Sequence, residues 1–94
     1  MVKFHIEKAE PPYKWVGVFE SFGRETRIRF GAVNYEDYTQ HKNPIRKTYY
    51  IARHRSREDW TKPMTAGALS RWILWETPSI EKNVKLFKER FNLE

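Results

Sequence analysis

The stretch KWVGVFESFGRETRIRF, residues 14–30, decides the fold of this chain. Residues 14–19, which are apolar after Lys14, favour a β-strand. From Thr26 to Phe30 every second residue is an arginine, which is the two-residue period of a strand with one buried face. Residues 21–24, Ser-Phe-Gly-Arg, separate the two runs and place a glycine where a tight hairpin needs one. The stretch therefore predicts an antiparallel β-hairpin.

A further strand is predicted before this hairpin. Apolar and polar residues alternate from Val2 to Glu7, again with the period of a strand that buries one face. Glu10-Pro11-Pro12 follows, and the two prolines cannot continue a ladder because each lacks a donor and has a fixed φ. The first part of the chain is therefore predicted to be a meander of three strands.

Helices are predicted for the rest of the chain. Residues 34–38, Asn-Tyr-Glu-Asp-Tyr, favour a capped turn or a short helix. Asn43 followed by Pro44 supplies an N-cap acceptor and a proline at the first turn, which predicts a helix over about residues 44–54. This helix has one apolar face, which we expect to be buried and which consists of Ile45, Tyr49 and Ala52.

Two more helices are predicted in the last third of the sequence. Residues 66–75 are apolar enough for a buried helix, although Gly67 weakens its first turn. Thr77-Pro78-Ser79 ends that element and begins an amphipathic helix. The predicted apolar face of the last helix consists of Ile80, Val84, Phe87 and Phe91. Its predicted solvent face carries Lys82, Lys85 and Lys88.

Strands followed by helices predict an α+β domain, in which a small N-terminal antiparallel three-stranded meander is covered by about three C-terminal helices. The 94 residues are few for two domains and contain no repeat or linker, so we expect a single domain over residues 1–94. Aromatic residues make up 16% of the chain, which supplies enough large side chains for a core.

Composition excludes several classes of site. The chain has no cysteine, so disulfides, zinc–thiolate centres and thiol nucleophiles are absent. No apolar run approaches the roughly 20 residues that a membrane-spanning helix needs, and residues 1–8 alternate charge with hydrophobe unlike a signal peptide. We therefore expect neither a membrane partner nor secretion by that route.

The excess of positive charge is local. Eighteen Lys and Arg residues against twelve Asp and Glu residues give a net charge of +6. No acid occurs between Asp37 and Glu58, and the six cations of that interval account for the whole excess. These six are Lys42, Arg46, Lys47, Arg53, Arg55 and Arg57. They are the predicted nucleic-acid-binding residues, because clustered cations attract polyanions.

Tyrosines are interleaved with these cations. An exposed Tyr49 or Tyr50 can stack on an unpaired base, whereas a buried one belongs to the core of a helix whose charges are merely solvated. Arg27 and Arg29, on the outer face of the third strand, either extend the basic surface or pair with nearby acids. The sequence leaves both questions open.

No catalytic or metal-binding motif is present. His41 and His54 are thirteen positions apart, which fits no compact ligand spacing, and phosphate-binding loops and nucleophile elbows are absent. We expect no catalytic residue, no metal and no small-molecule cofactor, and so a binding protein rather than an enzyme. A small nuclease that uses a dispersed set, for instance Tyr38, His41 and Arg53, is an alternative.

The densest apolar cluster, Trp72-Ile73-Leu74-Trp75, is predicted to be core, with an interface as the alternative. Large aromatic residues at helical spacing are needed for burial in so small a protein. Arg71 beside the cluster is predicted to form a buried ion pair with Glu58 or Asp59.

Four motifs occur in order along the chain: YEDYTQHK at 35–42, YIARH at 50–54, EDW at 58–60 and TAGALSRWILW at 65–75. Together they resemble a family of small uncharacterised proteins encoded by large double-stranded DNA viruses of algae and protists. The resemblance covers about the last two thirds of the chain, and the N-terminal strands carry less of it. It implies a viral setting and no chemistry, so no catalytic residue is carried over.

In that setting two functions fit a basic, cysteine-free domain. The favoured one is a non-enzymatic, DNA-associated protein whose cations neutralise phosphates, either packaged in the virion or acting in the nucleus or cytoplasm of an infected host cell. The other is a minor capsid or internal virion protein whose cations contact acidic surfaces of viral capsid proteins. Both need a basic surface and neither needs a reaction centre.

Overall fold

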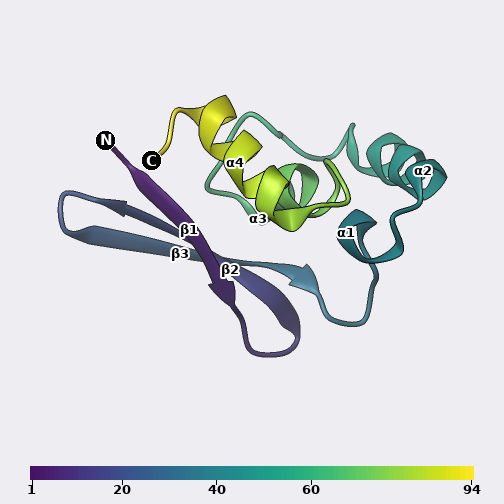
Figure 1. The fold of residues 1–94 in the computed structure, drawn as a ribbon, viewed down its shortest axis with the longest axis horizontal. Coiled ribbons are helices and arrows are strands. Elements are labelled where there is room, and N and C mark those ends of the chain that lie inside the picture. The colour runs from purple at the N-terminus through teal and green to yellow at the C-terminus, as the bar shows by residue number, and fades with distance from the viewer.

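The computed structural model of the chain describes residues 1–94 and begins with a three-stranded antiparallel sheet in the order β1-β2-β3. The strands are β1 (Lys3–Lys8), β2 (Tyr13–Ser21) and β3 (Arg24–Ala32). Helices make up the rest of the fold (Figure 1). The predicted α+β class and the predicted N-terminal meander are confirmed.

The β2–β3 hairpin has the tight turn that its sequence predicts. Ser21 pairs with Arg24, so only Phe22 and Gly23 form the connection. Both have positive φ angles, 50° and 74°, as a two-residue turn that follows the right-handed twist of the strands requires. Glycine adopts such angles without strain, and the Phe22 side chain is 98% exposed at the hairpin tip.

The helical part consists of α1 (Tyr38–His41), α2 (Pro44–His54), α3 (Ala66–Leu69), the π-helical turn η1 (Ser70–Leu74) and α4 (Ile80–Phe91). The prediction for residues 44–54 matches α2, which Asn43 caps by accepting from the N–H groups of Ile45 and Arg46. The predicted helix over 66–75 is α3 running directly into η1. The short helix begins at Tyr38, because Asp37 is its N-cap rather than part of it.

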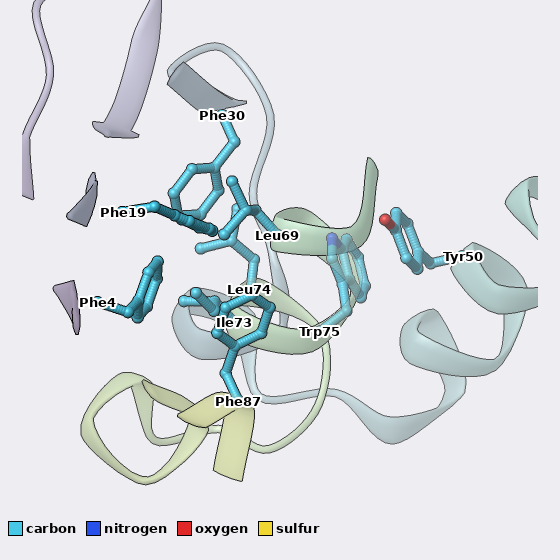
Figure 2. Packing of buried hydrophobic residues seen from close by; sticks show 9 residues of the cluster. All are labelled: Phe4, Phe19, Phe30, Tyr50, Leu69, Ile73, Leu74, Trp75 and Phe87. Carbon is cyan, nitrogen blue, oxygen red and sulfur yellow. The ribbon is translucent and has the colours of Figure 1, made fainter. Parts of the chain in front are cut away.

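The core lies between the sheet and the segment from α3 to α4. Phe4 and Phe19 meet edge to face at 4.8 Å between ring centroids, and Phe87 of α4 packs on Phe4 at 4.7 Å. Figure 2 shows the nine clustered side chains, with Tyr50 and Trp75 at one side. They are Phe4, Phe19, Phe30, Tyr50, Leu69, Ile73, Leu74, Trp75 and Phe87. The helices that cover the sheet are thus α3, η1 and α4, while α1 and α2 lie beside it (Figure 1).

The apolar cluster at residues 72–75 is core, as predicted. Ile73, Leu74 and Trp75 are buried, and Trp72 is half-buried against them. The indole N–H of Trp72 donates to the carbonyl of Trp60 at 2.9 Å. The guanidinium of Arg90 lies 3.6 Å from the centre of a Trp72 ring, so the outer face of this side chain is covered by a cation.

One buried amide joins η1 to α4. Asn83 is fully buried, and its Nδ2 donates to the carbonyls of Ile73 at 2.7 Å and Thr77 at 2.9 Å. Its Oδ1 accepts from the backbone N–H and the hydroxyl of Thr77. Every polar atom of the side chain therefore has a partner, which removes the cost of burying it.

Two predictions about side chains were wrong. The predicted face of Ile45, Tyr49 and Ala52 is exposed, and α2 instead buries Tyr50 and partly buries Ile51, because the ring of Tyr50 stacks on that of Trp75. Arg71 pairs with Glu76 at 3.1 Å rather than with an acid at 58 or 59, because the chain after η1 folds back beside it. The predicted faces of α4 are confirmed, with Phe87 buried and the lysines toward solvent.

The two ends of the chain lie together (Figure 1). The N–H of Phe4 donates to the carbonyl of Glu94 at 2.7 Å, and the N–H of Glu94 donates to the carbonyl of Val2 at 2.9 Å. These bonds extend the pairing of β1 on its outer side. No helix has the length and apolarity needed to cross a membrane.

Replacement of the core residue Phe87 by Ala should lower the free energy of unfolding by about 3–5 kcal/mol, because it leaves a cavity between α4 and the sheet. Urea denaturation followed by tryptophan fluorescence measures the change. Phe22→Ala is the matched control: the same side chain is lost from the exposed hairpin tip, and the expected change is within about 0.5 kcal/mol. Equal effects of the two substitutions would contradict the assignment of the core.

Candidate functional site

A cleft of about 780 Å³ opens between α2 and the rest of the molecule. Its walls come from the ends of β2 and β3, the segment 35–37, one face of α2, residues 57–58, and the α3–η1 helix. Clefts that bury small organic molecules have volumes of about 300–1,000 Å³, and they combine apolar and aromatic walls with a few polar groups. The volume of this cleft lies in that range, but its lining is more polar, with 7 hydrophobic residues among 18.

Three of the six predicted cations line the cleft: Arg46, Arg53 and Arg57. Seven residues, close to two helical turns, separate Arg46 from Arg53, so both lie on the same face of α2. Arg46 is 3.2 Å from Glu36 in a solvent-exposed pair, which holds it only weakly. Arg53 and Arg57 form no ion pair.

The other three predicted cations lie outside the cleft lining. Lys42 is exposed at the end of α1, and Arg55 is exposed at the end of α2. Lys47 is half-buried, donates to the carbonyl of Glu76 at 2.7 Å and lies 3.5 Å from the carboxylate of the same residue. The structure therefore gives Lys47 a role in holding α2, while Lys42 and Arg55 remain free at the surface.

The arginines of the third strand lie elsewhere. Arg27 pairs with Glu7 at 2.7 Å and with Glu25 at 3.3 Å, so it is a partner of nearby acids. The guanidinium of Arg29 lies 5.2 Å from the ring centre of Tyr13. Neither arginine lines the cleft.

A column of aromatic rings forms one wall. The rings of Tyr50 and Trp75 are almost parallel, at 3° and 4.3 Å between centroids, and His54 stacks on Tyr50 at 4.4 Å. Tyr50 is buried, and burial together with the negative charge of Glu58 raises its pKa, so its hydroxyl stays protonated at neutral pH. The neighbouring tyrosine Tyr49 is 63% exposed, which answers the question that the sequence left open.

Three carboxylates also line the cleft, and each has a partner. Asp37 is buried, is 2.7 Å from the ammonium of Lys14 and caps α1. Glu58 accepts from the indole N–H of Trp60 at 2.8 Å and is 2.9 Å from Nδ1 of His54. A Cβ at Gly67 would lie 3.1 Å from the carboxylate of Glu58, so a residue without a side chain permits this approach. Sequence patterns gave no sign of this role for Glu58.

Four cations thus face three carboxylates in the lining, Lys14, Arg46, Arg53 and Arg57 against Glu36, Asp37 and Glu58. Lys14 and Arg46 are paired, and the unpaired positive charge lies on α2 and just beyond it, at Arg53 and Arg57. The free cations of the cleft therefore lie on the α2 side, where Glu58 also lies, while Glu36 and Asp37 belong to the segment before α1.

In the alternative set of Tyr38, His41 and Arg53, the rings of Tyr38 and His41 lie 6.1 Å apart between centroids. Arg53 lines the cleft, and the other two do not. His41 packs its ring at 5.2 Å from Trp75, and its Nδ1 accepts from the N–H of Asn43 at 3.0 Å. Its Nε2 is buried without a partner. No group of three or more His, Asp and Glu side chains is placed to hold a metal ion.

Burial, reinforced by the positive charge of Arg46, lowers the pKa of His41 below its ordinary value of 6.5. The unfolded chain therefore binds this proton more readily than the folded one. The stability that neutral His41 contributes is present above pH 6.5 and is lost as the pH falls through the pKa of the folded state. Urea midpoints at a series of pH values from 7.5 downward should therefore fall less in His41→Asn than in the unsubstituted chain.

The control for this comparison is Phe22→Ala, which removes no titratable group and should keep the pH dependence of the unsubstituted chain. Asn is chosen because its side-chain oxygen can replace Nδ1 as the acceptor for Asn43. A His41→Asn variant that lost stability with acid as steeply as the control would show that another group is responsible.

Comparison with known proteins gives one match. Residues 9–54, slightly under half of the chain, match a family of unknown function, DUF5754. No curated protein and no solved structure matches. The match includes the motifs at 35–42 and 50–54, ends before those at 58–60 and 65–75, and extends over the N-terminal strands that carried less of the resemblance. Over β2, β3, α1 and α2 the chain is therefore similar to a family whose function is not known.

Proposed function

We propose that this protein binds nucleic acid through contacts between its arginines and phosphates, with little sequence preference and without catalysing a reaction on it. The observation that carries the proposal is the group Arg53, Arg55 and Arg57. All three are exposed, none forms an ion pair, and no acidic residue occurs between Asp37 and Glu58. Phosphates are the polyanionic groups that such cations neutralise.

Several other cations of the molecule, unlike these three, have a carboxylate partner. Lys14, Arg27 and Arg71 each have a carboxylate partner within 4.0 Å. Lys82 and Lys85 of α4 are exposed, but Glu81 and Glu89 share that helix and reduce its local charge. At the end of α2 three exposed cations without an ion-pair partner follow one another closely in sequence, which favours it as the phosphate-binding surface.

The biological setting is part of the proposal. The motifs at 35–42, 50–54, 58–60 and 65–75 support a viral protein that associates with the genome, packaged in the virion or active in the nucleus or cytoplasm of the infected cell. Binding through phosphates suits such a role, because a packaged protein must contact nucleic acid of any sequence.

Charge reversal tests the surface. Arg53→Glu, Arg55→Glu and Arg57→Glu should each weaken binding of a labelled oligonucleotide in comparable steps. Each should also reduce the slope of log affinity against log salt by about 1, because one phosphate contact is lost. Fluorescence anisotropy at several salt concentrations measures both quantities. Lys85→Glu is the matched control, since it makes the same change of charge at an exposed position on α4.

Three outcomes would contradict the proposal. An equal effect of Lys85→Glu would mean that binding of the oligonucleotide depends on the net charge of the protein and not on the position of the arginines at the end of α2. Binding that is absent at low salt, or insensitive to salt, would favour an acidic protein surface such as that of a capsid subunit as the partner. Strand cleavage by the purified protein, with or without a divalent metal, would overturn the non-catalytic assignment.

A further inference from the structure

The cleft beside α2 differs in chemistry from the surface that contacts phosphates. Tyr35, 76% exposed, and Tyr49, 63% exposed, both line it, and neither side chain is needed for the core. Exposed tyrosines in a cleft offer flat rings on side chains with few rotatable bonds, so that contact with them costs little conformational entropy. Such rings are the platforms on which unpaired bases stack.

Cations and aromatic rings alternate along this face of α2. Tyr49 follows Arg46 by three residues and precedes Arg53 by four, so the three side chains lie on one face of the helix. All three line the cleft. Surfaces that bind single strands combine these two elements, because the cations follow the backbone while the rings receive successive bases.

The charges inside the cleft favour a base over a phosphate. Two of the four cations in the lining, Lys14 and Arg46, are already paired with Asp37 and Glu36, so a phosphate placed beside them would have to compete with a carboxylate. A base carries no charge and does not compete for these cations. The free arginines, Arg53 and Arg57, belong to α2 and the turn after it, and they can hold the backbone while the base enters.

We infer that the cleft between α2 and the α3–η1 helix receives an unpaired base, so that the protein prefers single-stranded to duplex nucleic acid. The inference rests on the proposed function and adds the class of substrate to it. The bases of a duplex are paired and stacked inside the helix, so a duplex presents only its phosphates to α2. A single strand presents phosphates to the arginines and a base to Tyr35 and Tyr49 at the same time.

Fluorescence anisotropy with three labelled probes tests this inference: a single strand, the duplex of the same sequence, and a strand of equal length whose bases are replaced by abasic sites. The single strand should bind most tightly, because the other two offer the phosphates without an accessible base. Tyr49→Ala and Tyr35→Ala should each weaken binding of the single strand by about tenfold, the effect of losing one stacked base. Binding of the duplex and the salt slope should stay unchanged, because no charge is removed.

Two further variants make the test specific. Tyr49→Phe keeps the ring and should bind the single strand as the unsubstituted protein does. Phe22→Ala removes an exposed aromatic ring outside the cleft and should have no effect on any probe. Both tyrosines are exposed, so their replacement leaves the fold intact, which circular dichroism checks.

The outcomes separate the two proposals. If the duplex or the abasic strand binds as tightly as the single strand, the cleft receives no base, and the phosphate-binding function stands alone. If Tyr49→Ala weakens binding of all three probes equally, Tyr49 does not act through a base and the inference is overturned. If no probe binds at low salt, the proposed function itself fails.

Discussion

The stacking of Tyr50 on Trp75 determines where α2 lies. Tyr50 is the one buried residue of this helix, so the helix has little other apolar surface with which to dock. Two parallel rings 4.3 Å apart exclude water over the whole area of both, and aromatic pairs add about 0.5–1.5 kcal/mol to that burial. Lys47 adds a second attachment through the carbonyl of Glu76. The arginines of α2 and one wall of the cleft take their positions from these two contacts.

A polar contact fixes the opposite side of the cleft. The ammonium of Lys14, on β2, donates to Asp37, to Gln40 and to the carbonyl of Tyr35. Because both ions of the Lys14–Asp37 pair are largely buried, their attraction is offset by the cost of desolvation, and their main effect is to specify one arrangement. The segment before α1 is thereby held against the end of the sheet, with Tyr35 at the edge of the cleft.

The spacing of apolar and polar residues correctly predicted the strands and helices, but it did not predict which side of α2 is buried. The strands, the Asn43-Pro44 helix start and the faces of α4 follow from residue spacing, and the structure has them. Tyr49 and Tyr50 are adjacent, so each face of α2 carries one tyrosine, and the spacing of Ile45, Tyr49 and Ala52 favoured the face that is exposed in the structure. The stacking of Tyr50 on Trp75, a residue far along the chain, determines which face of α2 is buried, and the spacing of residues within α2 does not predict this contact. The same holds for the site, since the cleft is assembled from segments far apart in the sequence, and only the arginines and tyrosines of α2 and the turn after it stood out in sequence.

The pairing of Glu94 with the backbone of Val2 and Phe4 closes the chain into a loop of nearly its full length. The entropy cost of such a loop grows with the logarithm of its length, and it must be met before the contact forms. Phe87 of α4 packs on Phe4 inside that loop, so the apolar face of β1 is covered only once α4 has packed against it. The β2–β3 hairpin needs no distant partner and can form early. During synthesis β1, the hairpin and α2 therefore emerge before the helices that cover the sheet, and the domain becomes fully stable only after α4 has packed and Glu94 has paired with β1.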